Sequence, residues 1–334
     1  MPNWSPRHDL AIKRIRSILA RYTVATMRML EQKISDAGPF NQRIDPHILT
    51  EARNALSQKG VIQTRHLSSL PWYYLTNVDQ ALLAKRLHEL DAIHRQTAKK
   101  DFSNLLGQAL EIATFKALKG QTDLVFFGNY PDLDAHEDNK MYSKEEPPSS
   151  LSGIQIPGGK QLDFLVQHKT AGYAGLEMKN IREWIYPDRD EIRELLAKCC
   201  ALDVVPVLIA RRIHFSTFSV LNPCGVLMHQ TYNQLYPNSE KALAEKVRDK
   251  NLLGYHDVRV GNDPDDRLIA FIGTHLPNLI QEARVKFDQF KDLLCAYGRG
   301  EINYPTFAAV SGRRRRGESE DLDNLEGDDY EGYE

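Results

Sequence analysis

Two neighbouring stretches in the middle of the chain constrain its fold more than any other feature. The segments Gln161–Lys169 and Ala174–Asn180 both alternate apolar and polar side chains, as half-buried β-strands do. Gly172 lies in the short connection between them, where a glycine can take the positive φ of a tight turn. The sequence therefore predicts an antiparallel hairpin.

The same alternation predicts that charged side chains meet on one face of this hairpin. On the first strand Asp163 alternates with apolar residues, and on the second strand Glu177 and Lys179 do. The apolar residues should share the opposite face: Leu162, Phe164 and Val166 of the first strand, and Leu176 and Met178 of the second. Two carboxylates beside an ammonium group are a costly arrangement unless a cation binds there, and Mg²⁺ prefers such oxygen ligands.

These residues resemble the signature of the PD-(D/E)XK, or restriction-endonuclease-like, nucleases. That signature is an Asp on one strand and (Asp/Glu)-X-Lys on the next, which Asp163 and Glu177-Met178-Lys179 match, with Leu162 in place of the proline. The resemblance implies that Asp163 and Glu177 bind Mg²⁺, for which Mn²⁺ can substitute, and that Lys179 positions the attacking water. A solvated hairpin face is the ordinary alternative, because Glu-X-Lys also occurs by chance.

The segments around the hairpin occur in the order that this resemblance requires. A helix is expected over 102–120, a strand over 123–130, a second helix over 187–203 and a buried strand over 204–213. The fold class is therefore expected to be α/β (α+β), with a restriction-endonuclease-like αβββαβ core around a mixed central sheet. Glu111 follows Gly107 in the first helix, and the resemblance implies that it is a third metal ligand, although a solvent-facing glutamate is the alternative.

The first hundred residues are basic, with 16 Lys and Arg against 8 Asp and Glu. A helix that begins at Asp45-Pro46 is followed by two short segments rich in β-formers, which resembles a winged-helix domain. This resemblance implies contacts to DNA from the helix and hairpin. The expected nucleic-acid contacts are Arg53, Lys59, Arg65 and His66, together with Arg211 and Arg212 at the end of the later strand. A helical domain with merely solvated basic residues is the alternative.

The end of the chain is strongly acidic. Nine acidic residues lie in 318–334, and without them 43 basic residues face 36 acidic ones, so the formal net charge changes from −2 to +7. Residues 311–334 are expected to form a disordered charged tail, after a nucleic-acid-binding domain over 1–100 and a nuclease-like domain with a helical extension over 101–310. The tail could bind a protein partner, compete with nucleic acid or only solubilise the chain.

Several classes of protein are disfavoured by the composition. No apolar run approaches the ~20 residues of a membrane span, and the first residues lack the apolar core of a signal peptide. The four cysteines lack the spacing of a disulfide framework or a metal-thiolate site. The sequence thus predicts a cytoplasmic, metal-dependent DNA endonuclease, without a membrane partner. A non-catalytic DNA-binding regulator or scaffold and an RNA-cleaving relative are the alternatives left open, and a homodimer is compatible with each of these functions.

Overall fold

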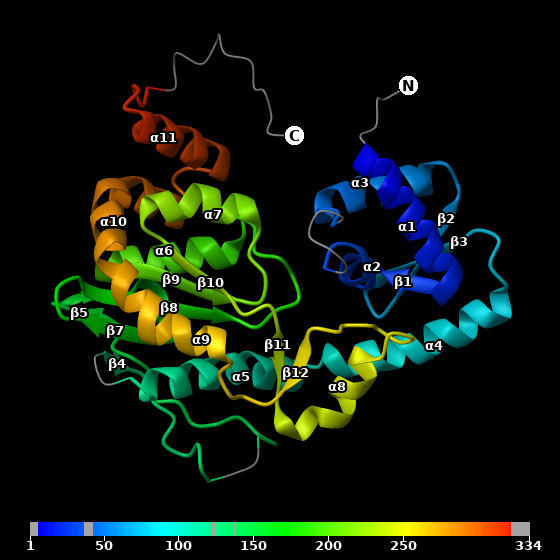
Figure 1. The fold of residues 1–334 in the computed structure, drawn as a ribbon, viewed down its shortest axis with the longest axis horizontal. Coiled ribbons are helices and arrows are strands. Elements are labelled where there is room, and N and C mark those ends of the chain that lie inside the picture. The colour runs from blue at the N-terminus through cyan, green and yellow to red at the C-terminus, as the bar shows by residue number, and fades with distance from the viewer. Residues whose placement is uncertain (1–5, 37–42, 122–123, 136–137, 322–334) are drawn as a thin grey trace. The chain divides into compact units, whose positions relative to one another are not determined.

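We describe the protein from a computed structural model over residues 6–36, 43–121, 124–135 and 138–321 (Figure 1). The chain divides into two compact units. The first unit comprises the described residues of Met1–Leu106, Glu137–Met141 and Asn233–Gly261, and the second those of Gly107–His136, Tyr142–Tyr232 and Asn262–Glu334. Where it is described, the protein is a mixed α/β fold.

The first unit begins with three helices and three short strands. In chain order they are α1 (Pro6–Tyr22), β1 (Val24–Thr26), α2 (Met27–Ile34), α3 (Pro46–Gln58), β2 (Ile62–Leu67) and β3 (Leu70–Leu75). The strands form an antiparallel sheet in the order β1-β3-β2. Ser68 and Ser69 turn the β2–β3 hairpin with positive φ angles of 49° and 64°. Trp72 of β3 is fully buried and belongs to the core of this unit.

The remainder of the first unit comes partly from a distant segment. The helix α4 (Gln80–Thr97) begins at Asp79, whose carboxylate accepts the Leu82 N–H. Further along the chain, β11 (Gln234–Tyr236) pairs in parallel with β12 (Val258–Val260), and α8 (Lys241–Arg248) lies between them in sequence. Val247 and Val258 join the same buried apolar cluster as Leu49 and Trp72. The sequence placed 233–261 in the later domain, and the structure places this segment in the first unit.

A mixed five-stranded sheet with the order β10-β9-β8-β7-β4 forms the centre of the second unit. Its strands are β4 (Val125–Phe127), β7 (Phe164–His168), β8 (Gly172–Lys179), β9 (Val205–Ala210) and β10 (Leu227–Gln230). The pairs β4–β7 and β7–β8 are antiparallel, whereas β8–β9 and β9–β10 are parallel. Phe164 pairs with Leu176, and Gly172 has a φ of 74°, so the predicted hairpin is confirmed. Asp123, at the start of the expected first strand, lies outside the described residues.

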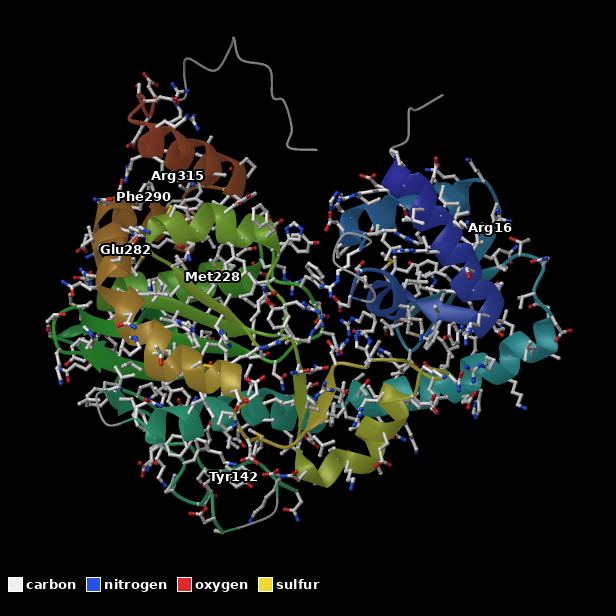
Figure 2. The ribbon with its side chains drawn as sticks, viewed as in Figure 1. Arg16, Tyr142, Met228, Glu282, Phe290 and Arg315 are labelled. Carbon is white, nitrogen blue, oxygen red and sulfur yellow. The ribbon has the colours of Figure 1, made fainter. Side chains whose placement is uncertain are left out.

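Helices pack on both faces of this sheet. On one face, the Phe115 ring of α5 (Lys100–Lys119) stacks on Phe164 with ring centroids 6.4 Å apart. On the other face, Leu165 and Leu208 of the sheet share an apolar cluster with α6 (Asp190–Leu202) and α10 (Leu276–Gly298). Phe290 of α10 points into this cluster, whereas Glu282 of the same helix is exposed (Figure 2).

Shorter elements complete the second unit. They are β5 (Ser150–Leu151), β6 (Ile154–Gln155), α7 (Phe215–Leu221), α9 (Asp266–Ala270), a π-helical turn (Phe271–His275) and α11 (Tyr304–Arg316). Three-residue 3₁₀ turns occur at Pro157–Gly159, Asn222–Cys224 and, in the first unit, Asn238–Glu240. Among the described residues, none of the helices has the length and apolar character that crossing a membrane requires.

The helix α11 extends into the segment expected to be a disordered tail. Asn303 caps its start by accepting the Thr306 N–H, and Gly317 ends it in the left-handed conformation. Phe307 and Ser311 are buried, and Arg314 binds the Asp292 carboxylate of α10 at 2.6 Å. Burial on one side of the helix thus orders residues 311–316, although their composition indicates a tail. Residues 322–334 lie outside the described part of the chain.

Candidate active site

Asp163 lies one residue before β7 and is held by the backbone of β8. Its own N–H donates to the Leu176 carbonyl at 3.0 Å, and its Oδ2 accepts the Met178 N–H at 2.7 Å. The carboxylate therefore stands where the next backbone acceptor of β7 would stand in a regular ladder. These two hydrogen bonds fix Asp163 at the end of the hairpin, opposite the β8 residues on either side of Glu177.

The predicted alternation fails on the first strand at the residue before Asp163. Leu162 was expected on the face of Phe164, but it belongs to the opposite cluster with Leu165. The Leu162 side chain fits there because residue 175 is a glycine: a Cβ at this position would lie 2.6 Å from the Leu162 Cδ1 atom. Consequently the Asp163 carboxylate turns toward Lys144, whose ammonium lies 5.6 Å from the centre of the Phe164 ring.

Glu177 faces the helix α6 and is almost entirely buried, with 3% of its surface exposed. The Lys198 ammonium of α6 donates to both of its carboxylate oxygens, at 2.8 and 3.0 Å. Lys179, the last residue of β8, donates to the Glu177 Oε1 at 2.9 Å. Glu177 and Lys179 thus share a face, as the alternation of β8 predicts.

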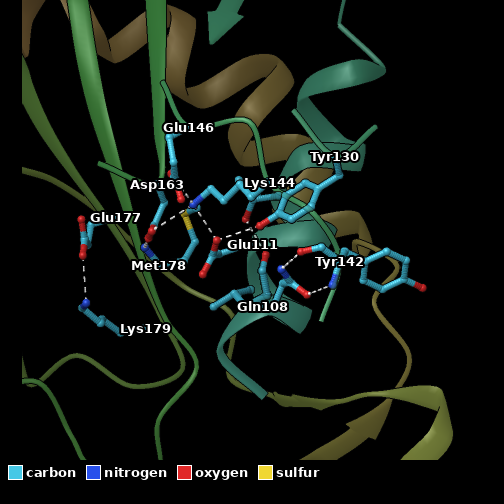
Figure 3. A network of polar contacts seen from close by, with 12 residues as sticks. Gln108, Glu111, Tyr130, Tyr142, Lys144, Glu146, Asp163, Glu177, Met178 and Lys179 are labelled. Carbon is cyan, nitrogen blue, oxygen red and sulfur yellow. Dashed lines mark hydrogen bonds and ion pairs between the residues drawn. The ribbon is translucent and has the colours of Figure 1, made fainter. Parts of the chain in front are cut away.

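On the side of α5, a second network surrounds Lys144 (Figure 3). The Lys144 ammonium lies 2.7 Å from a Glu111 oxygen, 3.3 Å from Glu146 and 3.5 Å from Asp163. The Tyr130 hydroxyl donates to the same Glu111 oxygen at 2.7 Å. Glu111 therefore reaches toward Asp163 and does not simply face solvent. Direct contacts divide the predicted trio into two groups: Asp163 contacts this network, whereas Glu177 contacts Lys198 and Lys179.

The three carboxylates nevertheless interact electrostatically. Burial, followed by the charges of Glu177 and Glu111, raises the pKa of Asp163 to about 7, against the opposing effects of Lys144 and the Met178 N–H. Burial alone would lower the pKa of Lys144, but the neighbouring carboxylates outweigh it and the pKa is raised. Burial and then the negative charge of Glu111 raise the pKa of Tyr130, so its hydroxyl stays a donor. The charges of both Glu177 and Glu111 therefore act on Asp163.

The donor set fits a hard divalent cation in its chemistry. Asp163, Glu177 and Glu111 offer carboxylate oxygens, and the charges of Glu177 and Glu111 add to burial in raising the pKa of Asp163, an effect that a bound cation would oppose. In this structure Lys144 and Lys198 supply the positive charge. Within the described residues, no three His, Cys, Asp or Glu side chains are grouped so as to hold a metal ion.

The residues expected to contact nucleic acid fall into two classes. Lys59, Arg65 and His66 are exposed on the first unit. Arg53 is partly buried, since its guanidinium lies over the Tyr73 ring and donates to the Tyr73 hydroxyl at 2.9 Å.

Arg211 and Arg212 are both buried, which differs from the expectation that they meet phosphate. Arg211 is 2% exposed and donates to the carbonyl oxygens of Ile181 and Arg182. The Arg212 guanidinium lies 4.9 Å from the centre of the Tyr232 ring. Arg211 therefore stabilises the chain after β8, and Arg212 packs against aromatic rings.

Sequence reasoning missed Lys144, Lys198 and Tyr130. Lys144 lies in a polar segment that reads as a flexible insertion, which conceals its contacts. Lys198 carries a signal that could have identified it, because it falls among the apolar residues on the buried face of α6: Ile192, Leu195, Leu196, Cys199 and Leu202. A lysine in such a stripe requires a buried partner.

Comparison with other proteins adds no assignment to this geometry. No protein-family model, no curated protein and no solved structure matches the chain. The function therefore has to be inferred from the arrangement of these side chains.

Proposed function

We propose that the protein is a metal-dependent DNA endonuclease of the PD-(D/E)XK type, which hydrolyses phosphodiester bonds. The observation that carries this proposal is the position of Asp163: its Oδ2 accepts the N–H of Met178, the residue between Glu177 and Lys179, and Lys144 links it to Glu111. A carboxylate whose pKa is raised by burial and by two neighbouring carboxylates, with Lys179 on the adjacent strand, is typical of a site that binds a cation and a phosphate. The order α5, β4, β7, β8, α6, β9 supports the αβββαβ core of this superfamily.

Each residue of the site has a distinct role in this proposal. Asp163, Glu177 and Glu111 would hold Mg²⁺ or Mn²⁺, which when bound lowers the pKa of water and shields the phosphate charge. Lys179 orients the attacking water and stabilises the negative charge that develops on the phosphate. Lys198 and Tyr130 act as positioning residues, because they fix the carboxylates of Glu177 and Glu111.

The first unit supplies affinity for DNA in the same proposal. The order α1-β1-α2-α3-β2-β3 with the sheet β1-β3-β2 supports a winged-helix arrangement. Lys59 follows α3, and Arg65 and His66 lie on β2, so these exposed residues flank the helix that such domains present to DNA.

A plasmid cleavage assay tests the proposed activity. Purified protein should nick or linearise plasmid DNA with Mg²⁺, and not with EDTA. Lys179→Ala should abolish cleavage, whereas Lys286→Ala, which removes a partly exposed lysine of α10, should leave it unchanged. If Lys179→Ala cuts as fast as the parent protein, the catalytic site is assigned wrongly.

A non-catalytic DNA-binding protein is the second candidate. The observation that favours it is the ion pairing of the carboxylates, since Lys144 and Lys198 already neutralise Glu111 and Glu177. Such a protein would bind DNA with the same affinity in Mg²⁺, Mn²⁺ and EDTA and would not cleave it under any of these conditions. Parallel ribonucleotide substrates distinguish the RNA-cleaving relative.

A further inference from the structure

Beyond the carboxylates, the second unit carries a cluster of aromatic rings and arginines at the ends of its parallel strands. The chain leaves β8, β9 and β10 at the same edge of the sheet, because these strands are mutually parallel. The segments that follow them are tied together: Ile185 N–H donates to the Arg212 carbonyl at 3.0 Å, and Tyr232 N–H to the Arg211 carbonyl at 3.1 Å. In open α/β sheets, ligands bind at this edge.

The side chains at this edge combine planar rings with cations. The guanidinium of Arg212 lies 4.9 Å from the centre of the Tyr232 ring and 6.0 Å from that of Trp184. The Arg267 guanidinium lies 5.0 Å from the Tyr232 ring. Tyr232 and Arg267 are exposed and Trp184 is partly exposed. We call Trp184, Arg212, Tyr232 and Arg267 the strand-end platform.

Two features of the platform are costly for a merely structural surface. Tyr232 has a φ of 61°, a left-handed conformation that a bulky side chain rarely adopts, while 39% of the residue is exposed. The Trp184 Nε1 atom is shielded from solvent and has no hydrogen-bond partner among the described residues. A strained, exposed ring and an unsatisfied indole N–H are typical of a surface that is completed by a ligand.

We propose that the strand-end platform binds single-stranded DNA by stacking unpaired bases on Tyr232 and Trp184. Rings beside guanidinium groups suit a ligand that is both planar and anionic. Duplex DNA does not fit, since its base faces are stacked within the helix, whereas an unpaired strand exposes them. The platform adjoins the proposed cleavage site, because the Lys179 carbonyl accepts the Arg211 N–H at 3.4 Å. It would hold an unpaired segment beside the scissile phosphate.

Fluorescence anisotropy in EDTA tests this binding without cleavage. The probes are a labelled oligothymidine of about twelve nucleotides and a duplex of the same length. Tyr232→Gly should weaken oligothymidine binding about tenfold or more, since one stacked base is lost. Duplex binding should be unchanged, and so should the thermal midpoint, because glycine tolerates the positive φ. Tyr232→Phe keeps the ring and should bind like the parent protein.

Arg267 provides a test of the charge. Arg267→Ala should weaken oligothymidine binding and reduce its salt dependence by about 0.7 in log affinity per log salt. The matched control is Arg299→Ala, an exposed arginine near the end of α10 that pairs with Glu301. Equal losses in the two variants would contradict the proposal.

The platform is overturned if Tyr232→Gly binds oligothymidine as tightly as the parent protein, or loses duplex and single-strand binding equally. The choice of DNA as the ligand rests on the proposed function, but experiments can refute the nuclease and the strand-end platform independently of each other. A protein that never cleaves, yet needs Tyr232 for single-strand binding, refutes the nuclease and keeps the platform. A nuclease that does not need Tyr232 for binding does the reverse.

Discussion

The Lys198 ammonium binds both carboxylate oxygens of Glu177, and both side chains are buried. Removing Lys198 leaves the buried Glu177 carboxylate with Lys179 on its Oε1 atom as the partner that remains, and a buried charge that loses a partner is strongly destabilising. We therefore expect Lys198→Met to lower the free energy of unfolding by about 3–5 kcal/mol. Glu177→Gln in the same chain should restore part of this loss, because the buried negative charge that Lys198 balanced is then absent.

Urea unfolding of the two single variants and the double variant measures this coupling. The exposed pair of Lys160 and Glu194, with a distance of 2.7 Å, is the matched control, since surface pairs contribute about 0–1 kcal/mol. A Lys198→Met protein that is as stable as the Lys160→Met protein would contradict the assignment of a buried ion pair.

The raised pKa of Asp163 predicts a pH dependence of stability. Its pKa is about 7 in the folded protein and 3.8 ordinarily, so the folded state binds the proton more tightly. The stabilising contribution of this group is therefore complete below about pH 4 and is lost as the pH rises to 7, with a total of about 4 kcal/mol. Asp163→Asn should lack this component.

Chemical unfolding of the parent protein and Asp163→Asn at a series of pH values from 4 to 8 checks this prediction. The difference in stability between the two proteins should change steadily in favour of the variant as the pH rises. Asp288→Asn, an exposed residue of α10 that pairs with Arg284, serves as the control. A difference that is constant with pH would mean that Asp163 ionises at its ordinary pKa.

The hairpin, α5 and α6 could be predicted because their apolar residues repeat with the period of a strand or a helix, and β9 because its residues form a near-continuous apolar run. The direction of the Asp163 side chain could not. It depends on Leu162 filling the space beside Gly175, which is a tertiary contact between residues outside one regular strand. The contacts of Lys144 could not be predicted either, because a loop has no periodicity that indicates what its side chains contact.

The exposed basic residues of the first unit should dominate the salt dependence of DNA binding. If Lys59 and Arg65 each contact a phosphate, the Lys59→Ala/Arg65→Ala protein should lose about 0.9 per contact from the slope of log affinity against log salt on duplex DNA. Titrations at several salt concentrations measure the slope. Lys85→Ala, on the exposed side of α4, should leave it unchanged. An unaltered slope in the double variant would place the duplex-binding surface elsewhere.

Lys144 decides between a catalytic and a binding role for the carboxylates, because its ammonium competes with any metal at Glu111 and Asp163. Lys144→Met removes this competitor and leaves all three carboxylates in place. We expect Mg²⁺ to bind more tightly to the variant, and calorimetric titration and the rise of the thermal midpoint with added Mg²⁺ both measure this. Lys140→Met, an exposed lysine four residues away, is the control. If neither protein binds Mg²⁺, the carboxylates serve only the fold, and the metal-dependent reaction is refuted.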